Sequence, residues 1–230
     1  KGATWSEPIM LNSQVKADSD KFFGVGPGRG LVTTVNGKER ILFPCYTHIN
    51  NNTENTYVIY SDDQGKSWHR VQVTSNLSSE ATLTEADGKI YMFTRWGGYY
   101  VSTDGGESWT SKGNVEGISY TKTCQMNAIT YSKPIDGKTA ILLSAATSER
   151  SNGKIFVGLV QDDESIQWKN DKGYAVNDGT FQYSCMTELK DGSIALLYEN
   201  GKASEYFVKY SMDTLLGQKD STLTDEATGV

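Results

Sequence analysis

The chain has 230 residues, 37% of them hydrophobic, which is enough for one globular domain with its own core. A net charge of −6 without a basic run argues against nucleic acid as a partner. The longest apolar stretch, residues 140–143, is too short to insert into a membrane. Three scattered cysteines (Cys45, Cys124 and Cys185) do not suit a disulfide framework or a zinc site, so we predict buried free thiols and no bound metal.

The predicted elements are strands that pair as successive hairpins. Each of the four hairpins has an Asn-Gly or Asp-Gly pair at its turn, a sequence that favours tight two-residue connections. Their strands are 31–35 with 40–44, 80–85 with 89–95, 128–131 with 140–144, and 185–189 with 193–198. Further strands are predicted near 154–160 and 206–211. No segment has a sustained helical period, although a single turn is predicted near 213–216.

A short pattern, Ser-x-Asp-x-Gly-x-Ser-Trp, occurs at residues 61–68 and again at 102–109. Residues 2–5 have the Gly-to-Trp spacing of a third copy, and residues 162–168 are interpreted as a decayed fourth. The residue types suit a hairpin turn, because Asp accepts backbone hydrogen bonds, Gly adopts positive φ and Trp buries a large ring. Such a repeat predicts one structural unit used several times around a symmetric body.

This repeat is the Asp-box of sialidases and of some other β-propellers. From residue 1 to about residue 216, the chain resembles the C-terminal half of the catalytic domain of secreted bacterial sialidases. Besides the repeats, the segments that carry the resemblance are 22–28, 92–95, 124–129, 149–153 and 181–184. The resemblance implies an all-β, six-bladed β-propeller of which residues 1–216 supply roughly the last four blades. Residues 217–230 are then a loose tail or linker, and the protein is secreted by a bacterium or held at its surface.

The activity implied is that of an exo-α-sialidase, which releases terminal sialic acid from glycoconjugates through a covalent tyrosyl intermediate without a cofactor. The resemblance places Tyr183 as the nucleophile and Glu80 as its base. The substrate carries a carboxylate on its anomeric carbon, so a neutral phenol is a better attacker there than a second carboxylate. A phenol of pKa about 10 needs a base within hydrogen-bonding reach. Glu85 is near in sequence, but it adjoins the turn at 87–88, at the far end of the strand, so Glu80 is preferred.

The substrate carboxylate requires a planar, permanently charged fork, which arginine provides and lysine does not. Arg95 and Arg150 match the second and third members of the arginine triad of sialidases. Glu199 matches a carboxylate that orients the first member, and Gln125 is a supporting pocket neighbour. The motif of that first arginine, Phe/Tyr-Arg-Ile-Pro, and the catalytic Asp that follows it do not occur in these 230 residues. The resemblance therefore implies that an upstream part of the same domain supplies them, and the 230 residues alone are expected to be inactive.

Two alternatives remain open. The first is an intramolecular trans-sialidase, or a relative that yields an anhydro or unsaturated product. Relatives that form anhydro products tend to place a bulky Trp over the pocket, in the loop that is residues 200–205 here; this loop has no aromatic residue, which favours hydrolysis. The second is a non-catalytic propeller that serves as a binding module, although such a module has no reason to keep Tyr183, Glu80, Arg95 and Arg150 together. The glycine run at 24–28 is predicted to be a sharp turn between blades, because no helix follows it as in a phosphate-binding loop.

Overall fold

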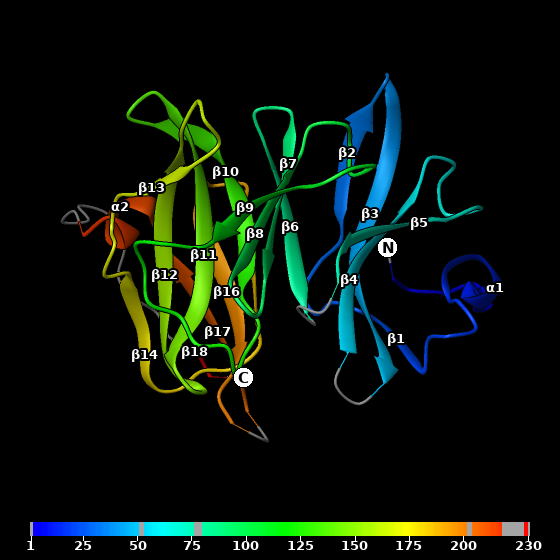
Figure 1. Cartoon of the computed structure of the whole chain (residues 1–230). Coiled ribbons are helices and arrows are strands. Elements are labelled where there is room, and N and C mark those ends of the chain that lie inside the picture. The colour runs from blue at the N-terminus through cyan, green and yellow to red at the C-terminus, as the bar shows by residue number, and fades with distance from the viewer. Residues whose placement is uncertain (1, 51–52, 76–79, 202–203, 218–227, 230) are drawn as a thin grey trace.

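The computed structural model describes residues 2–50, 53–75, 80–201, 204–217 and 228–229. Four antiparallel sheets follow one another along the chain and stand side by side as the blades of a β-propeller (Figure 1). The predicted all-β propeller fold is confirmed. No helix in the described ranges is long and apolar enough to cross a membrane.

The blades use consecutive parts of the chain. The first contains β1 (Phe22–Val25), β2 (Leu31–Val35), β3 (Lys38–Asn50), β4 (Thr53–Ser61) and β5 (His69–Thr74). The second contains β6 (Ala81–Ala86), β7 (Lys89–Thr94), β8 (Gly98–Ser102) and β9 (Thr110–Asn114). The third contains β10 (Asn127–Ile135), β11 (Lys138–Ser148), β12 (Ser151–Val160), β13 (Ile166–Trp168) and β14 (Tyr174–Thr180). The fourth contains β15 (Ser184–Glu188), β16 (Ile194–Glu199), β17 (Glu205–Tyr210) and β18 (Thr228–Gly229). Two one-turn helices lie outside the sheets in the described ranges, α1 (Asn12–Val15) before the first blade and α2 (Met212–Leu215) after β17.

The four predicted hairpins are confirmed as β2–β3, β6–β7, β10–β11 and β15–β16. Their turns explain why the sequence signal was strong. Asn36, Asp87 and Asp136 have φ between 49 and 52°, and the glycine after each has φ between 72 and 76°. Asn, Asp and Gly tolerate this left-handed region, and two such residues in succession match the twist of the flanking strands.

The Ser-x-Asp-x-Gly-x-Ser-Trp turns join β4 to β5 in the first blade and β8 to β9 in the second. In the first turn, Asp63 Oδ1 accepts a hydrogen bond from the Ser67 backbone N–H at 2.8 Å. Trp68 Nε1 closes the turn by donating to the Gly65 carbonyl at 3.0 Å. The second turn repeats both contacts. Asp104 Oδ1 accepts from the Ser108 backbone N–H at 2.9 Å, and Trp109 Nε1 donates to the Gly106 carbonyl at 3.1 Å.

The weaker copies differ from these two. At 162–168 the acidic turn persists, with Asp163 accepting from the Ser165 backbone N–H, but Trp168 donates to the Glu116 carbonyl instead of closing its own turn. Residues 2–5 form no strand, and Trp5 is 89% exposed. Of the tail predicted at 217–230, Thr228–Gly229 pairs with β17 as β18.

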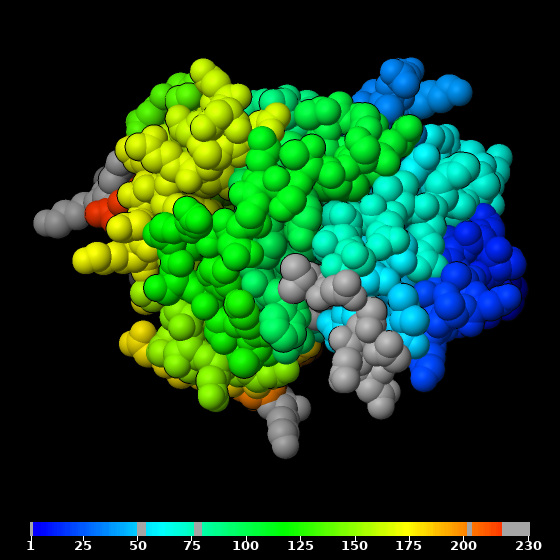
Figure 2. Space-filling model, in the orientation of Figure 1, coloured from blue at the N-terminus to red at the C-terminus, as the bar shows by residue number. Residues whose placement is uncertain are grey.

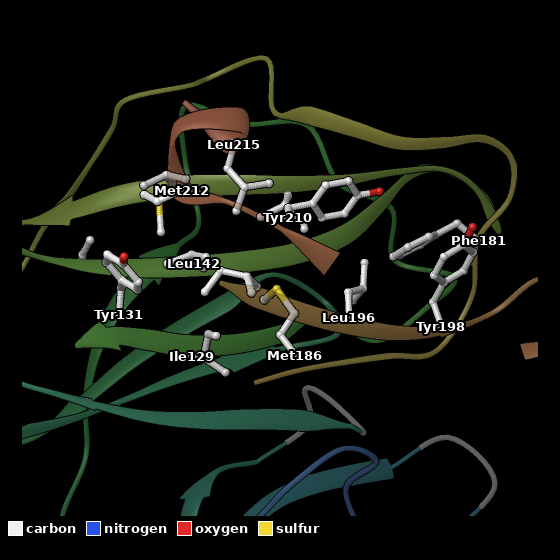
Figure 3. Close-up of a cluster of buried hydrophobic side chains, with 14 of the residues drawn as sticks. Ile129, Tyr131, Leu142, Phe181, Met186, Leu196, Tyr198, Tyr210, Met212 and Leu215 are labelled. Atoms are coloured by element: carbon white, nitrogen blue, oxygen red, sulfur yellow. The ribbon is translucent and has the colours of Figure 1, made fainter. Parts of the chain in front are cut away.

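The core lies between neighbouring blades. The third and fourth blades bury Leu142, Phe181, Met186 and Leu196 against one another, and α2 covers one end of this cluster with Leu215 (Figure 3). On the surface the blades pack closely side by side, with the N-terminal segment (blue) against the first blade (cyan) (Figure 2). The three thiols are free as predicted, but only Cys45 and Cys124 are buried, because Cys185 is partly exposed.

The glycine run at 24–28 does not connect two blades. Gly24 belongs to β1, which pairs with residues 45–48 of β3. The strand β2 pairs with residues 38–42 on the same edge of β3. The run therefore interrupts the innermost strand of one blade. A Cβ on Gly24 would lie 2.6 Å from the Phe22 ring, and one on Gly26 would lie 2.8 Å from the Ala81 carbonyl oxygen. These glycines serve close packing, a use that the sequence alone does not distinguish from a turn.

Candidate functional site

The four residues predicted to carry the chemistry lie at the ends of strands, away from the acidic turns. Glu80 immediately precedes β6 and Arg95 immediately follows β7. Arg150 lies in the turn between β11 and β12, and Tyr183 immediately precedes β15. Because the hairpin turn at 87–88 and the acidic turn at 103–108 lie at the opposite ends of these strands, the chemistry is separated from the turns by the length of a blade.

Tyr183 and Glu80 form the centre of the site. Tyr183 Oη donates a hydrogen bond to Glu80 Oε1 at 2.7 Å, across 103 residues of sequence. Glu80 is only 8% exposed. Burial, followed by the hydrogen bond to Glu80, raises the pKa of Tyr183. The phenol is therefore protonated at neutral pH and has a base in contact with its proton.

Arg95 supports this pair. Its Nη1 donates to Glu80 Oε2 at 2.9 Å and to Tyr183 Oη at 3.3 Å. Its Nε donates to the Lys122 carbonyl at 3.1 Å, and its Nη2 donates to the Thr123 carbonyl at 2.5 Å. A guanidinium has five N–H groups, so among the described residues these four contacts leave one Nη2 hydrogen without an acceptor.

Arg150 approaches Tyr183 from the neighbouring hairpin. Its Cζ lies 5.6 Å from the centroid of the Tyr183 ring, and its Nη1 donates to Gln182 Oε1 at 2.9 Å. Glu149 and Asn152 in the same turn have φ of 39° and 54°, in the left-handed region. Arg150 is exposed, and its Nη2 and Nε have no hydrogen-bond acceptor among the residues that the structure describes. The Gln182 contact was missed by sequence reasoning, since a glutamine beside the nucleophile has no distinctive pattern.

Gln125 and Asn127 fasten the strand that follows the nucleophile. Gln125 is 2% exposed and its Nε2 donates to the Ser184 carbonyl at 2.6 Å. Its Oε1 has no hydrogen-bond partner among the residues that the structure describes. Asn127 Oδ1 accepts from the Met186 backbone N–H at 2.8 Å. The third blade therefore holds the start of β15, and with it Tyr183, by buried amide contacts.

Glu199 is also close to the nucleophile. Its backbone N–H donates to the Tyr183 carbonyl at 3.0 Å. Its side chain lines a cavity of ≈ 140 Å³, together with Gln125 and Tyr183. Glu85 instead lines a larger cavity of ≈ 740 Å³ at the turn end of the inner strands, far from Tyr183. The structure thus brings Glu80, and not Glu85, to the phenol; the catalytic roles of the converging residues stay predictions.

Comparison with known proteins gives a family. The model of the BNR repeat-like domain matches residues 1–196. An anhydrosialidase of Macrobdella decora is 36% identical over 95% of this chain, and sialidase B of Streptococcus pneumoniae is 36% identical over 75% of it. This chain covers 32% and 26% of those two proteins, so it spans about a third or less of their length.

Two solved structures are similar over nearly the whole chain. The leech intramolecular trans-sialidase, complexed with 2,7-anhydro-Neu5Ac, has a TM-score of 0.82 and 36% identity, covering 95% of this chain and 36% of that one. The intramolecular trans-sialidase of Ruminococcus gnavus has a TM-score of 0.81 and 33% identity, covering 95% of this chain and 50% of that one. With its four blades, its converging site residues and these relatives, the chain belongs to the BNR repeat-like domain family and forms part of a sialidase β-propeller.

Proposed function

We propose that the protein carrying this chain is an exo-α-sialidase that releases terminal sialic acid from glycoconjugates through a covalent bond to Tyr183. The observation that carries this proposal is the Tyr183 Oη–Glu80 Oε1 hydrogen bond of 2.7 Å, flanked by two arginines. A buried carboxylate that touches a phenol proton is the arrangement that general-base activation of tyrosine requires. Because sialylated glycans are displayed outside cells, we propose that the enzyme acts as a secreted or surface-bound protein.

The raised pKa of Tyr183 favours a first step in which proton transfer accompanies the attack. A free phenolate is disfavoured at rest, so the proton moves to Glu80 while the oxygen attacks the anomeric carbon. A neutral attacker avoids repulsion from the substrate carboxylate, which a carboxylate nucleophile would suffer. In the second step water attacks the same carbon and the bond to Tyr183 breaks. Glu80 returns its proton to the departing Tyr183 oxygen, and the acid that protonated the leaving glycan oxygen in the first step, now deprotonated, takes the proton of the water.

The exposed guanidinium of Arg150, whose Nη2 and Nε have no acceptor among the described residues, suits a bidentate contact with the substrate carboxylate. Arg95 adds its remaining Nη2 hydrogen and holds Glu80 beside the phenol through their 2.9 Å ion pair. The leaving oxygen also needs an acid. We propose that the acid and a third arginine, which Glu199 would orient, come from an upstream part of the same catalytic domain.

Replacing Tyr183 by Phe in the protein that carries this chain tests the proposal. We expect kcat on an aryl sialoside to fall by about 10³ or more, because the nucleophilic oxygen is lost while the ring is kept. Binding of a sialic acid analogue should change little. Tyr131→Phe, at the turn end of the blades, is the matched control and should keep normal turnover. Normal turnover by Tyr183→Phe would refute the nucleophile assignment.

A second candidate is an intramolecular trans-sialidase, since the leech and Ruminococcus gnavus proteins with 36% and 33% identity carry that name. In that reaction a hydroxyl of the bound sugar, instead of water, attacks the anomeric carbon. We place hydrolysis first because the loop at 200–205 has no aromatic residue. The NMR spectrum of the product decides: free sialic acid supports hydrolysis, whereas 2,7-anhydro-Neu5Ac supports the second candidate.

A further inference from the structure

Residues 121–123 form a short loop between the two arginines of the site. The loop lies before β10, and the hairpin that carries Arg150 lies beside it. On one side, Arg95 Nε and Nη2 donate to two consecutive carbonyls of the loop, those of Lys122 and Thr123. Two adjacent acceptors fix the plane of the guanidinium as well as its position.

On its other side the loop is fastened to the hairpin of Arg150. Thr123 Oγ1 donates to the Glu149 carbonyl at 2.6 Å, and the Thr121 backbone N–H donates to the Ala146 carbonyl at 2.9 Å. Glu149 has φ of 39°, a conformation that is costly for a residue with a side chain and persists only where the surroundings support it. The Thr123 hydroxyl supplies such support, directly before Arg150.

The two threonines complete this arrangement with each other. The Thr123 backbone N–H donates to Thr121 Oγ1 at 3.2 Å, and the two hydroxyl oxygens are 2.9 Å apart. A hydroxyl has one hydrogen, and that of Thr123 is directed to Glu149. Thr121 is therefore the donor between the hydroxyls, and Thr123 Oγ1 both accepts and donates.

We propose that Thr123 is a positioning residue that sets the spacing between Arg95 and Arg150 and thereby the affinity for a ligand carboxylate. Its carbonyl holds one arginine, and its hydroxyl holds the turn that carries the other. A carboxylate shared by two guanidinium groups is bound well only when both are held within about 0.5 Å of the productive geometry. The inference rests on the proposed function, because it takes the ligand carboxylate to lie between these arginines.

The test measures two ligands, a sialic acid analogue with a free carboxylate and its methyl ester, on the protein that carries this chain. Thr123→Val keeps the β-branched shape and the carbonyl but removes the hydroxyl. We expect it to bind the free acid about 3- to 10-fold more weakly, the scale of one net hydrogen bond, and to bind the ester as the wild type does. Thr123→Ser should restore the affinity for the acid. Thr139→Val, at the turn end of the blades, likewise removes a threonine hydroxyl, one that donates to Asp87, and is the matched control.

Two results would overturn the inference: unchanged affinity of Thr123→Val for the acid, or equal loss for acid and ester, which would show a merely structural role. If Thr123→Val does not fold, Thr123→Ala gives the same comparison. With Arg150→Lys, the cost of Thr123→Val should shrink, because the spacing no longer matters once the fork is gone. A wild type that binds acid and ester equally would instead refute the carboxylate site of the proposed function.

Discussion

The position of Tyr183 depends on how Phe181, two residues earlier, packs against β12. Phe181 is fully buried, its ring lies 4.8 Å from that of Tyr198, and its backbone N–H donates to the Arg150 carbonyl at 2.9 Å. Gly153 on β12 makes room for this ring: a Cβ there would lie 2.1 Å from two Phe181 ring atoms. Gly153→Ala must therefore displace either the ring or the strand.

We expect Gly153→Ala to lower the free energy of unfolding by about 1–3 kcal/mol, the usual cost of an overpacked core. For a domain of this size each kcal/mol corresponds to about 2–4 °C in Tm. Gly179→Ala is the matched control, since its Cβ would meet Asn177 at an ordinary 3.5 Å. Surface changes of that kind stay within about 0.5 kcal/mol. Urea unfolding and thermal melts of both variants give the comparison.

The same substitution should reduce kcat at temperatures where the variant is still fully folded, because a displaced Phe181 moves the Tyr183 oxygen away from Glu80. Adding Phe181→Leu should relieve the clash, so the double variant should be more stable than the sum of the single effects, by about 0.5 kcal/mol or more. If Gly153→Ala is as stable and as active as Gly179→Ala, the packing argument is wrong. If the double variant is simply additive, the clash is not with Phe181.

Two further outcomes follow from the charged groups. Arg150→Lys should weaken a carboxylate-bearing analogue about tenfold or more by titration calorimetry, because a point charge replaces a planar fork; equal binding would remove Arg150 from the site. Hydrogen bonds from Ser67 lower the pKa of Asp63 to about 2, against about 3.9 in the unfolded chain. Since the folded pKa is the lower one, the stabilisation by Asp63 is complete above about pH 4 and is lost as pH falls toward 2. The stability gap between wild type and Asp63→Asn, measured by denaturant unfolding, should close over that range, and a gap independent of pH would contradict this reasoning.

Sequence reasoning located the inner hairpins because their turns require positive φ, which Asn36 and Asp87 with their following glycines mark clearly. It missed outer strands such as β9, whose five residues are all exposed and show no alternation. It also misread the strand β1 as a turn, because glycine at a close contact looks the same in sequence as glycine at a bend. Local conformation was therefore predictable where the backbone angle φ required a particular residue type. It was not predictable where the residue type was required by close packing.

The site divides in a similar way. Residues 103 positions apart cannot be paired by local pattern, so the Tyr183–Glu80 pair came from resemblance to a family. Lys122 and Thr123 were missed because Arg95 uses their carbonyls, and every residue type has a carbonyl. Gln182, which binds Arg150, was missed since a single amide has no spacing to detect.

The placement of the site residues follows from how a blade is built. Within a strand, the backbone groups are used by neighbouring strands and the side chains alternate into the cores between blades, so neither is free for a ligand. At one end of the strands, the polar groups of the acidic turns form hydrogen bonds within the turn, as the carboxylates of Asp63 and Asp104 do. The other end is left for chemistry, and Glu80, Arg95 and Tyr183 each lie one residue outside a strand there. A residue in that position is oriented by the rigid strand, while its side chain is still free to contact a ligand. We therefore expect changes in core packing, such as Gly153→Ala, to lower the rate of turnover. Changes in the acidic turns should alter stability alone.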